Sequence, residues 1–426
     1  MTATPGTEAP GQRLARAAVL AAARRAGIDV AEDGRPGPTT GPTTGPTGPT
    51  TGPVTGPSTV TVHDPAAYRA IVAGGSVGLG TSYAAGGWDA DDLVGTVRAV
   101  IRALPRPGGP AGRLAGAVGR TTALVGAVGR GDGRGDGREQ DRRDIQAHYD
   151  LGDDFFAAFL DPTLTYSCAY FDRPGMSLEE ASVAKLDRLC AKLDLRSEDD
   201  VLEIGTGWGS FAVHAAARYG CRVTTTTISD RQYAYASRRV ADAGLGHLVT
   251  VRHDDYRDLR GSWDKLVSVE MIEAVGWRQY PTFFEACADR LRPHGLMALQ
   301  AIVIDDALYE RAKRADDFIK AVVFPGSCIP SVAAIVDTVA RHTDLGVVGL
   351  EDIGQHYVET LHRWRQQFTA NRSTIADLGF DEPFLRTWDL YLAYCEAGFA
   401  ERRISDVQMV LAKPGWRPRP VDGPQP

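Results

Sequence analysis

The chain has 426 residues, of which 43% are hydrophobic and 24% charged, a balance that excludes a fibrous, wholly disordered or membrane-spanning protein. The formal net charge of −7 gives no indication of a general nucleic-acid-binding surface, and the length allows more than one domain. The six cysteines are scattered without a CxxC pair, so we expect no metal site and no disulfide framework.

Residues 1–57 are expected to form a disordered Gly/Pro/Thr-rich segment. Residues 14–26 could form a short helix ended by Gly27, but they lack the pattern of a signal peptide, which favours a cytoplasmic location. A Gly-Pro pair then recurs every few residues over 37–57, and this repeat disfavours both helix and strand. Because the repeat lacks a strict three-residue period, we expect a solvated tether and not collagen.

Two further segments precede the largest domain. Residues 58–104, with the strand-like TVTVHD and the sequence GLGTSYAAGGWD, are expected to form a small domain that packs on something larger. Residues 105–143 are rich in glycine and arginine. They can be interpreted as a flexible linker or as an arginine-bearing segment that lies on anionic lipid, and both interpretations stay open.

Residues 144–413 alternate between strand-like and helical patterns, which predicts an α/β domain with a βαβ-built, mainly parallel sheet. A short tail follows at 414–426. The expected strands are 199–205, 221–228, 247–255, 264–271, 295–304 and 405–413. The expected helices are 210–220, 230–244, 279–291, 356–372 and 383–402.

A glycine-rich turn, VLEIGTGWGSF, follows the first strand of this domain. Gly205, Gly207 and Gly209 let the backbone turn sharply and approach a ligand without a Cβ atom in the way. The turn lies at the carboxyl end of the strand, where doubly wound sheets bind cofactors. A dinucleotide fingerprint would place the third glycine one residue later. Glu203 is instead placed like the acidic residue of S-adenosylmethionine (SAM) methyltransferases.

Polar residues at the ends of the next two strands extend this candidate cofactor site. Thr227, Ser229 and Gln232 can offer hydroxyl or amide groups to a ribose or an amino-acid tail. Asp255 can accept from an adenine amine, and the ring of Tyr256 can stack. Each of these residues alone could equally be a helix cap or a turn residue, but their positions at successive strand ends favour cofactor binding.

The segment HYDLGDDFFAAFLDPTLTYSCAYF, taken with VLEIGTGWGS, TISDRQ and VEMIEAVG, resembles the cyclopropane-fatty-acid synthase family. This family includes the mycolic-acid methyltransferases and the enzymes that add a methyl or methylene branch to unsaturated phospholipids. The resemblance covers most of 144–413, and GLGTSYAAGGWD resembles the family's small N-terminal domain. It implies a Rossmann-like class I SAM-methyltransferase fold with a mainly parallel seven-stranded sheet.

The resemblance also implies a reaction and its partners. The π electrons of a cis double bond in a membrane phospholipid attack the methyl group of SAM, and a carbocation results. Loss of a proton then gives a cyclopropane, or a methylene branch after a hydride shift, with a bound bicarbonate ion as the proton acceptor. A reductase partner, a homodimer and a peripheral position on the inner membrane surface are compatible with this expectation.

The resemblance assigns roles to individual residues. Tyr166 and Ser167 correspond to SAM contacts. Cys168 corresponds to the active-site cysteine, which contacts the bicarbonate through its backbone and is no nucleophile; the alternative is a small buried side chain. Glu270 lies out of register with the family's motif and is interpreted as a strand-end residue. The bicarbonate ligands that the resemblance implies are Cys168, Glu273, Gln300, Ile302 and Tyr357.

Gln300 is the main departure from the family's pattern, because cyclopropane synthases have a histidine in this strand. Glutamine can bond to an anion but cannot become cationic or accept a proton near neutral pH. We therefore expect a methylene or methyl branch, as in a precursor of tuberculostearate, with a cyclopropane as the alternative product. Neither the double-bond position nor the head group can be read from the sequence.

Other interpretations remain open at this stage. The chain could methylate a soluble metabolite, or it could be a non-catalytic lipid-binding protein that uses the fold without turnover. Residues 324–331, FPGSCIPS, are expected to wall an acyl tunnel. The preceding residues 305–323 have the apolar spacing of a lid helix, which is also the spacing of an ordinary surface helix.

Overall fold

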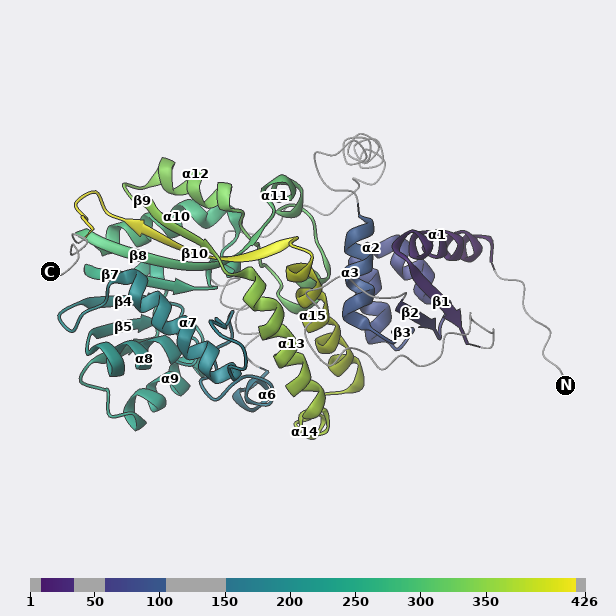
Figure 1. Ribbon diagram of the computed structural model, residues 1–426, viewed down its shortest axis with the longest axis horizontal. Helices are drawn as coiled ribbons and strands as arrows, with labels where there is room; N and C mark the ends of the chain where they lie inside the picture. The colour runs from purple at the N-terminus through teal and green to yellow at the C-terminus, as the bar shows by residue number, and fades with distance from the viewer. Residues whose placement is uncertain (1–8, 34–57, 105–150, 419–426) are drawn as a thin grey trace. The chain divides into compact units, whose positions relative to one another are not determined.

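The computed structural model describes residues 9–33, 58–104 and 151–418, which divide into two compact units (Figure 1). The first, here the N-terminal unit, comprises the described parts of Met1–Gly137 together with Ala307–Pro325 and Tyr357–Ile404. The second, here the sheet unit, comprises the described parts of Arg138–Asp306, Gly326–His356 and Ser405–Pro426. The expected continuous domain over 144–413 is therefore interrupted twice.

The sheet unit is built on a seven-stranded sheet in the order β6-β5-β4-β7-β8-β10-β9. The pairs from β6 through β8 are parallel, whereas β10 and β9 are antiparallel. This arrangement confirms the predicted mainly parallel α/β fold. The strands are β4 (Asp200–Ile204), β5 (Arg222–Thr226), β6 (Val249–Arg252), β7 (Trp263–Val269), β8 (Leu291–Ile304), β9 (Gly346–Asp352) and β10 (Ile404–Ala412).

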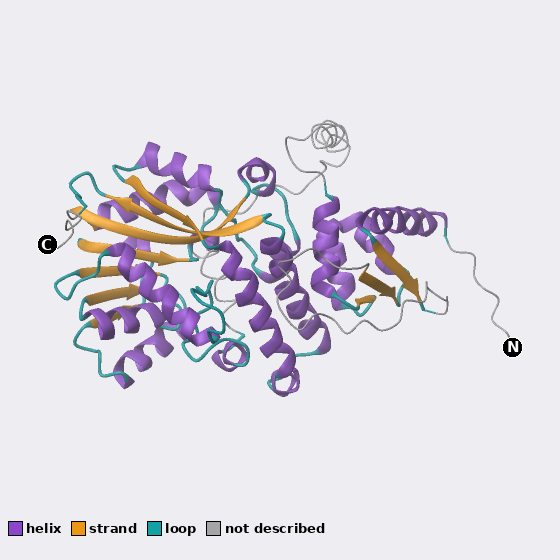
Figure 2. Ribbon diagram, viewed as in Figure 1, coloured by secondary structure: helices purple, strands orange, loops and turns teal. Residues whose placement is uncertain are grey.

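Helices and strands of this unit are interspersed along the chain, and Figure 2 shows the helices in purple and the strands in orange. Apolar faces of α7 and α8 close over the sheet, where Leu189, Phe211 and Val267 belong to one buried cluster. Ser177 begins α7 with a reciprocal capping box to Glu180, which satisfies two N–H groups at the helix end. The helices are α6 (Asp153–Ala157), α7 (Leu178–Leu193), α8 (Ser210–Tyr219), α9 (Asp230–Asp242), α10 (Tyr280–Arg290) and α12 (Val332–His342).

The N-terminal unit contains a three-stranded sheet, β1-β2-β3, and helices from distant parts of the chain. Its first half comprises α1 (Pro10–Ala26), β1 (Ile28–Glu32), β2 (Ser58–Val62), α2 (Ala66–Ala84), β3 (Trp88–Ala90) and α3 (Leu93–Ala103). Its second half comprises most of α11 (Asp306–Ala312), the π-helical turn η4 (Ile319–Val323), most of α13 (Gly354–Ala370), α14 (Arg372–Asp377) and α15 (Glu382–Ala400).

Residues 9–33 differ from the expected disorder. Helix α1 begins with proline at its first position and ends at Gly27 in the left-handed conformation (φ 72°), both favourable at those ends. Strand β1 then pairs in parallel with β2, and the Arg16 guanidinium pairs with Glu32 of β1. The pairing partner, β2, lies 26 or more residues further along the chain, so no local sequence pattern predicts strand β1. The repeat over 37–57 lies outside the described residues.

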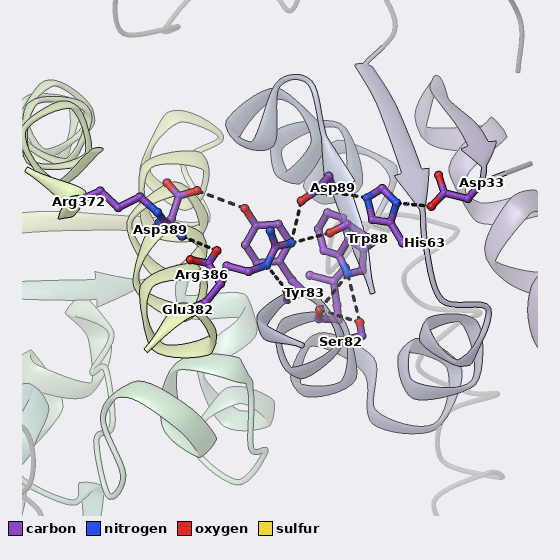
Figure 3. A network of polar contacts seen from close by, with 11 residues as sticks. Asp33, His63, Ser82, Tyr83, Trp88, Asp89, Arg372, Glu382, Arg386 and Asp389 are labelled. Atoms are coloured by element: carbon purple, nitrogen blue, oxygen red, sulfur yellow. Dashed lines mark hydrogen bonds and ion pairs between the residues drawn. The ribbon is translucent and has the colours of Figure 1, made fainter. Parts of the chain in front are cut away.

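Helix α15 belongs with the N-terminal unit because it packs against α2 and α3. Arg386 of α15 donates to the backbone oxygens of Tyr83 and Trp88 and to the carboxylate of Asp89 (Figure 3). At the other end of α15, Arg98 of α3 is 1% exposed and pairs with Glu401 at 2.8 Å. Buried charges need such partners, so these contacts hold the three helices together.

Residues 305–323 do not form the single lid helix that their spacing suggests. They form α11 and the turn η4, and between them Phe318 is buried. The Phe318 N–H donates to Ser76 of α2 at 3.3 Å. A Cβ atom at Gly80 would lie 2.1 Å from the Phe318 ring, so the glycine is what allows this close packing.

Among the described residues, no helix is both long and apolar enough to cross a membrane. Within residues 9–33, 58–104 and 151–418, no group of three or more His, Cys, Asp or Glu side chains is arranged to hold a metal ion. The glycine- and arginine-rich segment 105–143, with its possible contact to lipid, lies outside the described residues.

Candidate functional site

The glycine-rich turn lies where strand β4 ends and α8 begins. Gly205, Gly207 and Gly209 all have positive φ angles, of 100°, 52° and 84°, which only glycine adopts without strain. A Cβ atom at Gly205 would also lie 3.2 Å from the side chain of Met271. The turn therefore requires glycine for its conformation, as the sequence predicts.

A cavity of about 180 Å³ opens beside this turn, at the carboxyl ends of the strands. Nearly all the predicted cofactor residues line it: Tyr166, Ser167, Glu203, Gly205, Gly207, Thr227, Gln232, Asp255 and Tyr256. Gly209 and Ser229 are not among the lining residues. Gly209 precedes the first turn of α8, and the Ser229 hydroxyl accepts from the Gln232 N–H at 3.4 Å as the cap of α9.

Asp255 and Tyr256 lie at the cavity with a partner that sequence reasoning missed. Arg257 also lines the cavity, and its guanidinium and backbone N–H donate to both carboxylate oxygens of Asp255 at 2.6 to 2.9 Å. The carboxylate retains further lone pairs for an adenine amine, but it is held as part of an ion pair. At the carboxyl end of the neighbouring strand β5, the Thr227 hydroxyl donates to the Gln232 side-chain oxygen at 2.7 Å.

Glu203 is the buried acid of this cavity. It is 3% exposed, and its Oε2 has no hydrogen-bond partner among the described residues. Burial raises the pKa of Glu203 to about 8, although a hydrogen bond with Thr225 acts in the opposite direction. A buried carboxyl oxygen without a partner is costly, so the cavity fits a ligand that brings a donor or a cationic amine to Glu203.

The segment before α7 brings Tyr166 and Ser167 to the same cavity. Tyr166 packs against the rings of Phe156 and Phe159, with centroids 5.2 and 6.1 Å away. The Lys185 ammonium donates to the Ser167 hydroxyl at 2.7 Å. Lys185 is 1% exposed and lines the cavity, and burial lowers its pKa. In the sequence this lysine looks like an ordinary helix residue, and nothing in the pattern distinguishes it.

Cys168 is fully buried, and its backbone carries the polar contact. The Cys168 N–H donates to Oε1 of Glu270 at 2.8 Å. The thiol lies 3.3 Å from the Ala169 carbonyl oxygen, and burial, with Asp406 and Glu270 nearby, raises its pKa well above the usual range. A thiol held in its neutral form is a poor nucleophile, in line with the expectation that Cys168 does not attack the substrate.

Three buried side chains and the half-buried Glu270 form what we call the carboxyl-amide cluster: Glu270, Gln300, Asp406 and Gln408. The Gln300 amide nitrogen donates to Glu270 Oε1 at 2.7 Å and to Asp406 Oδ2 at 2.9 Å. The Gln300 oxygen accepts from the Gln408 amide at 3.0 Å. Both amide hydrogens and the oxygen of Gln300 are thus engaged by the protein. Of the cluster, Glu270 lines the cavity.

Two members of the cluster sit on a strand that carried no functional prediction. Asp406 and Gln408 come from β10, which neighbours β8 in the sheet. Burial and the carboxyl groups of Glu270 and Glu273 raise the pKa of Asp406 well above its usual range, which favours its neutral form. Glu270, expected to be only a strand-end residue, joins these side chains to the cavity.

Glu273 and Ile302 contact each other directly, while the binding of bicarbonate predicted for both stays a prediction. Oε1 of Glu273 accepts from the Ile302 N–H. Its Oε2 is buried with no hydrogen-bond partner in the described part of the chain, and burial raises the Glu273 pKa to about 8. The Glu273 carbonyl accepts from the Cys328 N–H at 2.7 Å, and Tyr280 donates to the Cys328 carbonyl. Residues 326–331 therefore brace the turn that carries Glu273.

Tyr357 belongs to the N-terminal unit. It is 5% exposed, and its ring packs against Phe399 of α15, with centroids 4.4 Å apart, and edge-on against Trp364 at 5.9 Å. Aromatic pairs at these separations contribute to packing. The predicted contact of Tyr357 with an anion stays a prediction.

Comparison with known proteins identifies the protein family of the chain. The family model for mycolic acid cyclopropane synthetase matches residues 137–409. The tuberculostearic acid methyltransferase UfaA1 of Mycobacterium tuberculosis is 40% identical over 362 residues, covering 83% of each protein. The cyclopropane-fatty-acyl-phospholipid synthase of Escherichia coli is 34% identical over 359 residues, covering 83% of this chain and 87% of the relative.

A solved structure agrees with these matches. The mycolic acid cyclopropane synthase CmaA1, in complex with SAH and CTAB, superposes with a TM-score of 0.60 at 30% sequence identity. The match covers 64% of this chain and 98% of that protein. The predictions of a SAM-dependent methyltransferase and of its fold are confirmed. The chain belongs to the mycolic acid cyclopropane synthetase family.

Proposed function

We propose that the protein transfers the methyl group of SAM to the cis double bond of an acyl chain in membrane phospholipid and makes a methylene- or methyl-branched chain. The names of the two relatives, a tuberculostearic acid methyltransferase and a cyclopropane-fatty-acyl-phospholipid synthase, support a fatty acyl chain as the substrate. The higher identity, 40% against 34%, is to the tuberculostearic acid methyltransferase. The cyclopropane synthase activity is the alternative.

The residues at the cavity fit SAM. The turn at Gly205 and Gly207 offers backbone without Cβ atoms, and Glu203 offers a buried carboxyl oxygen that needs a donor. Asp255 and Gln232 supply acceptors at neighbouring strand ends. When bound, SAM supplies an electrophilic methyl group. The chain's residues bind and orient it and exclude water from the site.

The proposal of a branched product rests on the hydrogen bonds of the Gln300 side chain. Its amide is engaged by Glu270, Asp406 and Gln408, so no group at this position can become cationic or take a proton near neutral pH. A cyclopropane synthase with histidine there would hold a titratable group instead. We therefore expect the carbocation in this site to undergo a hydride shift before it loses a proton. The shift moves the charge to the carbon that carries the new methyl group.

The bicarbonate ion that the resemblance implies is one candidate for the proton acceptor. Glu273 Oε2 favours it, because a buried carboxyl oxygen with no partner among the described residues can accept from the hydroxyl of bicarbonate. The Cys168 N–H and the Gln300 amide disfavour it, because both already donate to Glu270.

Phospholipid acyl chains lie in bilayers, so the proposed substrate requires that the enzyme meet a membrane surface. A cytoplasmic location with peripheral attachment remains part of the proposal, as do the reductase that would saturate a methylene product and the homodimer. Co-sedimentation with anionic and neutral vesicles at low and high salt tests the attachment. If the bound fraction depends neither on the charge of the lipid nor on the salt concentration, an electrostatic contact is contradicted.

Product analysis tests the proposed reaction. The full-length protein is incubated with SAM and dioleoyl phospholipid vesicles, and SAH formation and the acyl chains are followed. A cyclopropane and a methylene branch are isomers of equal mass, so mass spectrometry is combined with proton NMR, which separates ring protons from vinylic protons. Vinylic methylene signals support the proposal, whereas ring signals alone would support the cyclopropane alternative. Absence of any modified lipid would exclude both.

A further inference from the structure

Glu270 occupies a backbone conformation that normally selects glycine. Its φ angle is 48°, a left-handed conformation that strains a residue with a side chain. The residue follows β7 directly, and its N–H still donates to the Gln300 carbonyl at 2.8 Å, as in the sheet. Strain of this kind persists where the surrounding structure holds it, and it occurs often at functional sites.

The Glu270 carboxylate takes the hydrogen bonds that the resemblance assigns to a bicarbonate ion. Oε1 accepts from the backbone N–H of Cys168 at 2.8 Å and from the Gln300 amide at 2.7 Å. A carboxylate and a bicarbonate ion present the same planar O–C–O group with one negative charge. One functional group can therefore replace the other on the same donors.

Glu270 is also the side chain that joins the carboxyl-amide cluster to the cavity. Its neighbour Asp406 has a raised pKa because of burial and the nearby carboxyl groups, which favours the neutral form of Asp406 beside Glu270. The cation that faces the Glu270 carboxylate is Lys185, a buried residue that lines the same cavity. Lys185 Nζ donates a hydrogen bond to the Ser167 hydroxyl. The site thus presents a carboxylate next to the space for the reactants.

We propose that the Glu270 carboxylate is the proton acceptor of the alkylation, in the position that the resemblance gives to bicarbonate. This inference rests on the proposed function. After methyl transfer and the hydride shift, the positive charge lies on the carbon that bears the new methyl group. Glu270 takes a proton from that methyl group, and the C–H electron pair becomes the exocyclic C=C bond. The neutral acid releases its proton to water when the product leaves.

Two variants of Glu270 separate this role from a structural one. Glu270→Gln keeps the shape and accepts the Cys168 N–H, but an amide is no base, so turnover is expected to fall about 10²- to 10⁴-fold. Glu270→Gly relieves the backbone strain and leaves both donors without their acceptor, which creates a site for a small anion. Its turnover is expected to fall similarly in CO₂-free buffer and to recover with added bicarbonate or formate.

A matched control is Asp194→Gly, because Asp194 ends α7 with a φ of 53° outside the cavity lining. It relieves the same kind of strain and is expected to keep full turnover. SAH binding by calorimetry and thermal unfolding show that each variant is folded. A variant of Glu270 that loses SAH affinity while keeping its rate at saturating SAM would identify Glu270 as a cofactor ligand and overturn the inference.

The wild-type enzyme supplies the sharpest test. In CO₂-free buffer its turnover of dioleoyl phospholipid is expected to be unchanged, and added bicarbonate is expected to have no effect. Turnover that falls on CO₂ removal and returns with bicarbonate would overturn the inference while leaving the proposed function intact. A wild-type protein that modifies no lipid in either buffer would remove the proposed function, and this inference with it.

Discussion

Gln300 donates a side-chain hydrogen bond to Asp406 Oδ2 at 2.9 Å, and the two residues lie on the neighbouring strands β8 and β10. This bond joins the strand that departs from the cyclopropane-synthase pattern to one on which the sequence marks no site. It also fixes the amide, because the same nitrogen donates to Glu270 at 2.7 Å. Product choice and local stability are therefore expected to depend on the same two residues.

Replacing Gln300 by histidine is expected to change the product. Between two carboxyl groups, an imidazole would have a raised pKa and would become cationic. The fraction of cyclopropane among the modified chains should rise relative to the methylene product. Proton NMR of lipid treated with Gln300→His measures this ratio. Gln355→His, on an exposed face of α13, serves as the control, and an unchanged ratio in Gln300→His would argue that Gln300 does not set the product.

Asp406→Ala is expected to lower the free energy of unfolding by about 1–3 kcal/mol, because it removes an acceptor of the buried Gln300 amide. Asp406→Asn should cost much less. The raised pKa of Asp406 favours a neutral side chain, and an amide oxygen can accept the same hydrogen bond. Urea unfolding compares the two variants. Equal losses would show that the native side chain carries a charge.

Glu203 predicts a pH dependence of stability in the protein without SAM. Its pKa is about 8 in the folded protein, against 4.5 for an ordinary glutamate. The folded state therefore holds a proton that the unfolded state releases above pH 4.5, so this contribution to stability is complete below that pH. It is lost as the pH rises toward 8.

The amide side chain introduced by Glu203→Gln does not titrate. The free energy of unfolding of this variant should therefore rise relative to that of the wild type between about pH 5 and pH 8, by roughly 3–4 kcal/mol. Urea unfolding across this range measures the difference. Glu198→Gln, at an exposed side chain (68%), is the control and should show a flat difference. A flat difference for Glu203→Gln as well would contradict the buried, protonated state.

His63 in the N-terminal unit predicts a pH effect of its own. Its ring nitrogens each lie 2.8 Å from a carboxylate oxygen, of Asp33 and of Asp89 (Figure 3). These hydrogen bonds raise the pKa of His63 above 6.5. Arg386 donates to the other oxygen of Asp89. The stabilisation by His63 is therefore complete below pH 6.5 and is lost as the pH rises through the raised pKa.

His63→Asn is accordingly expected to be less stable than the wild type in mild acid, with a difference that shrinks on the alkaline side. Thermal unfolding over this pH range measures it. His247→Asn is the matched control, because that imidazole meets the backbone carbonyl of Gly244 and no carboxylate. A difference for His63→Asn that is constant with pH would mean that the two carboxylates do not favour the charged imidazole.

The glycine turn and the strands around it could be predicted from the sequence because their signals are local. Gly205 and Gly207 occupy positive-φ positions next to a continuous apolar strand, and both features are visible in one short segment. Strand β9 was missed, because its residues are largely exposed and the segment lacks a buried apolar run. Ser229 could equally be a ligand or a helix cap, and only the structure shows the cap.

The carboxyl-amide cluster could not be predicted in the same way. Glu270, Gln300 and Asp406 come from the ends or middles of three strands, and their meeting depends on the order β7-β8-β10. No spacing in the chain encodes that order for a single sequence. The raised pKa values of Glu203 and Glu273 follow from burial, which depends on packing and not on neighbours along the chain.

The way α15 completes the N-terminal unit has a consequence for protein engineering. Helices α2 and α3 would expose apolar surface and the Arg98 side chain if residues 382–401 were missing. An exchange of the amino-terminal part between two relatives therefore has to carry this distant helix with it. A chimaera joined after residue 104 alone would unite helices whose salt bridges and ring contacts evolved with other partners.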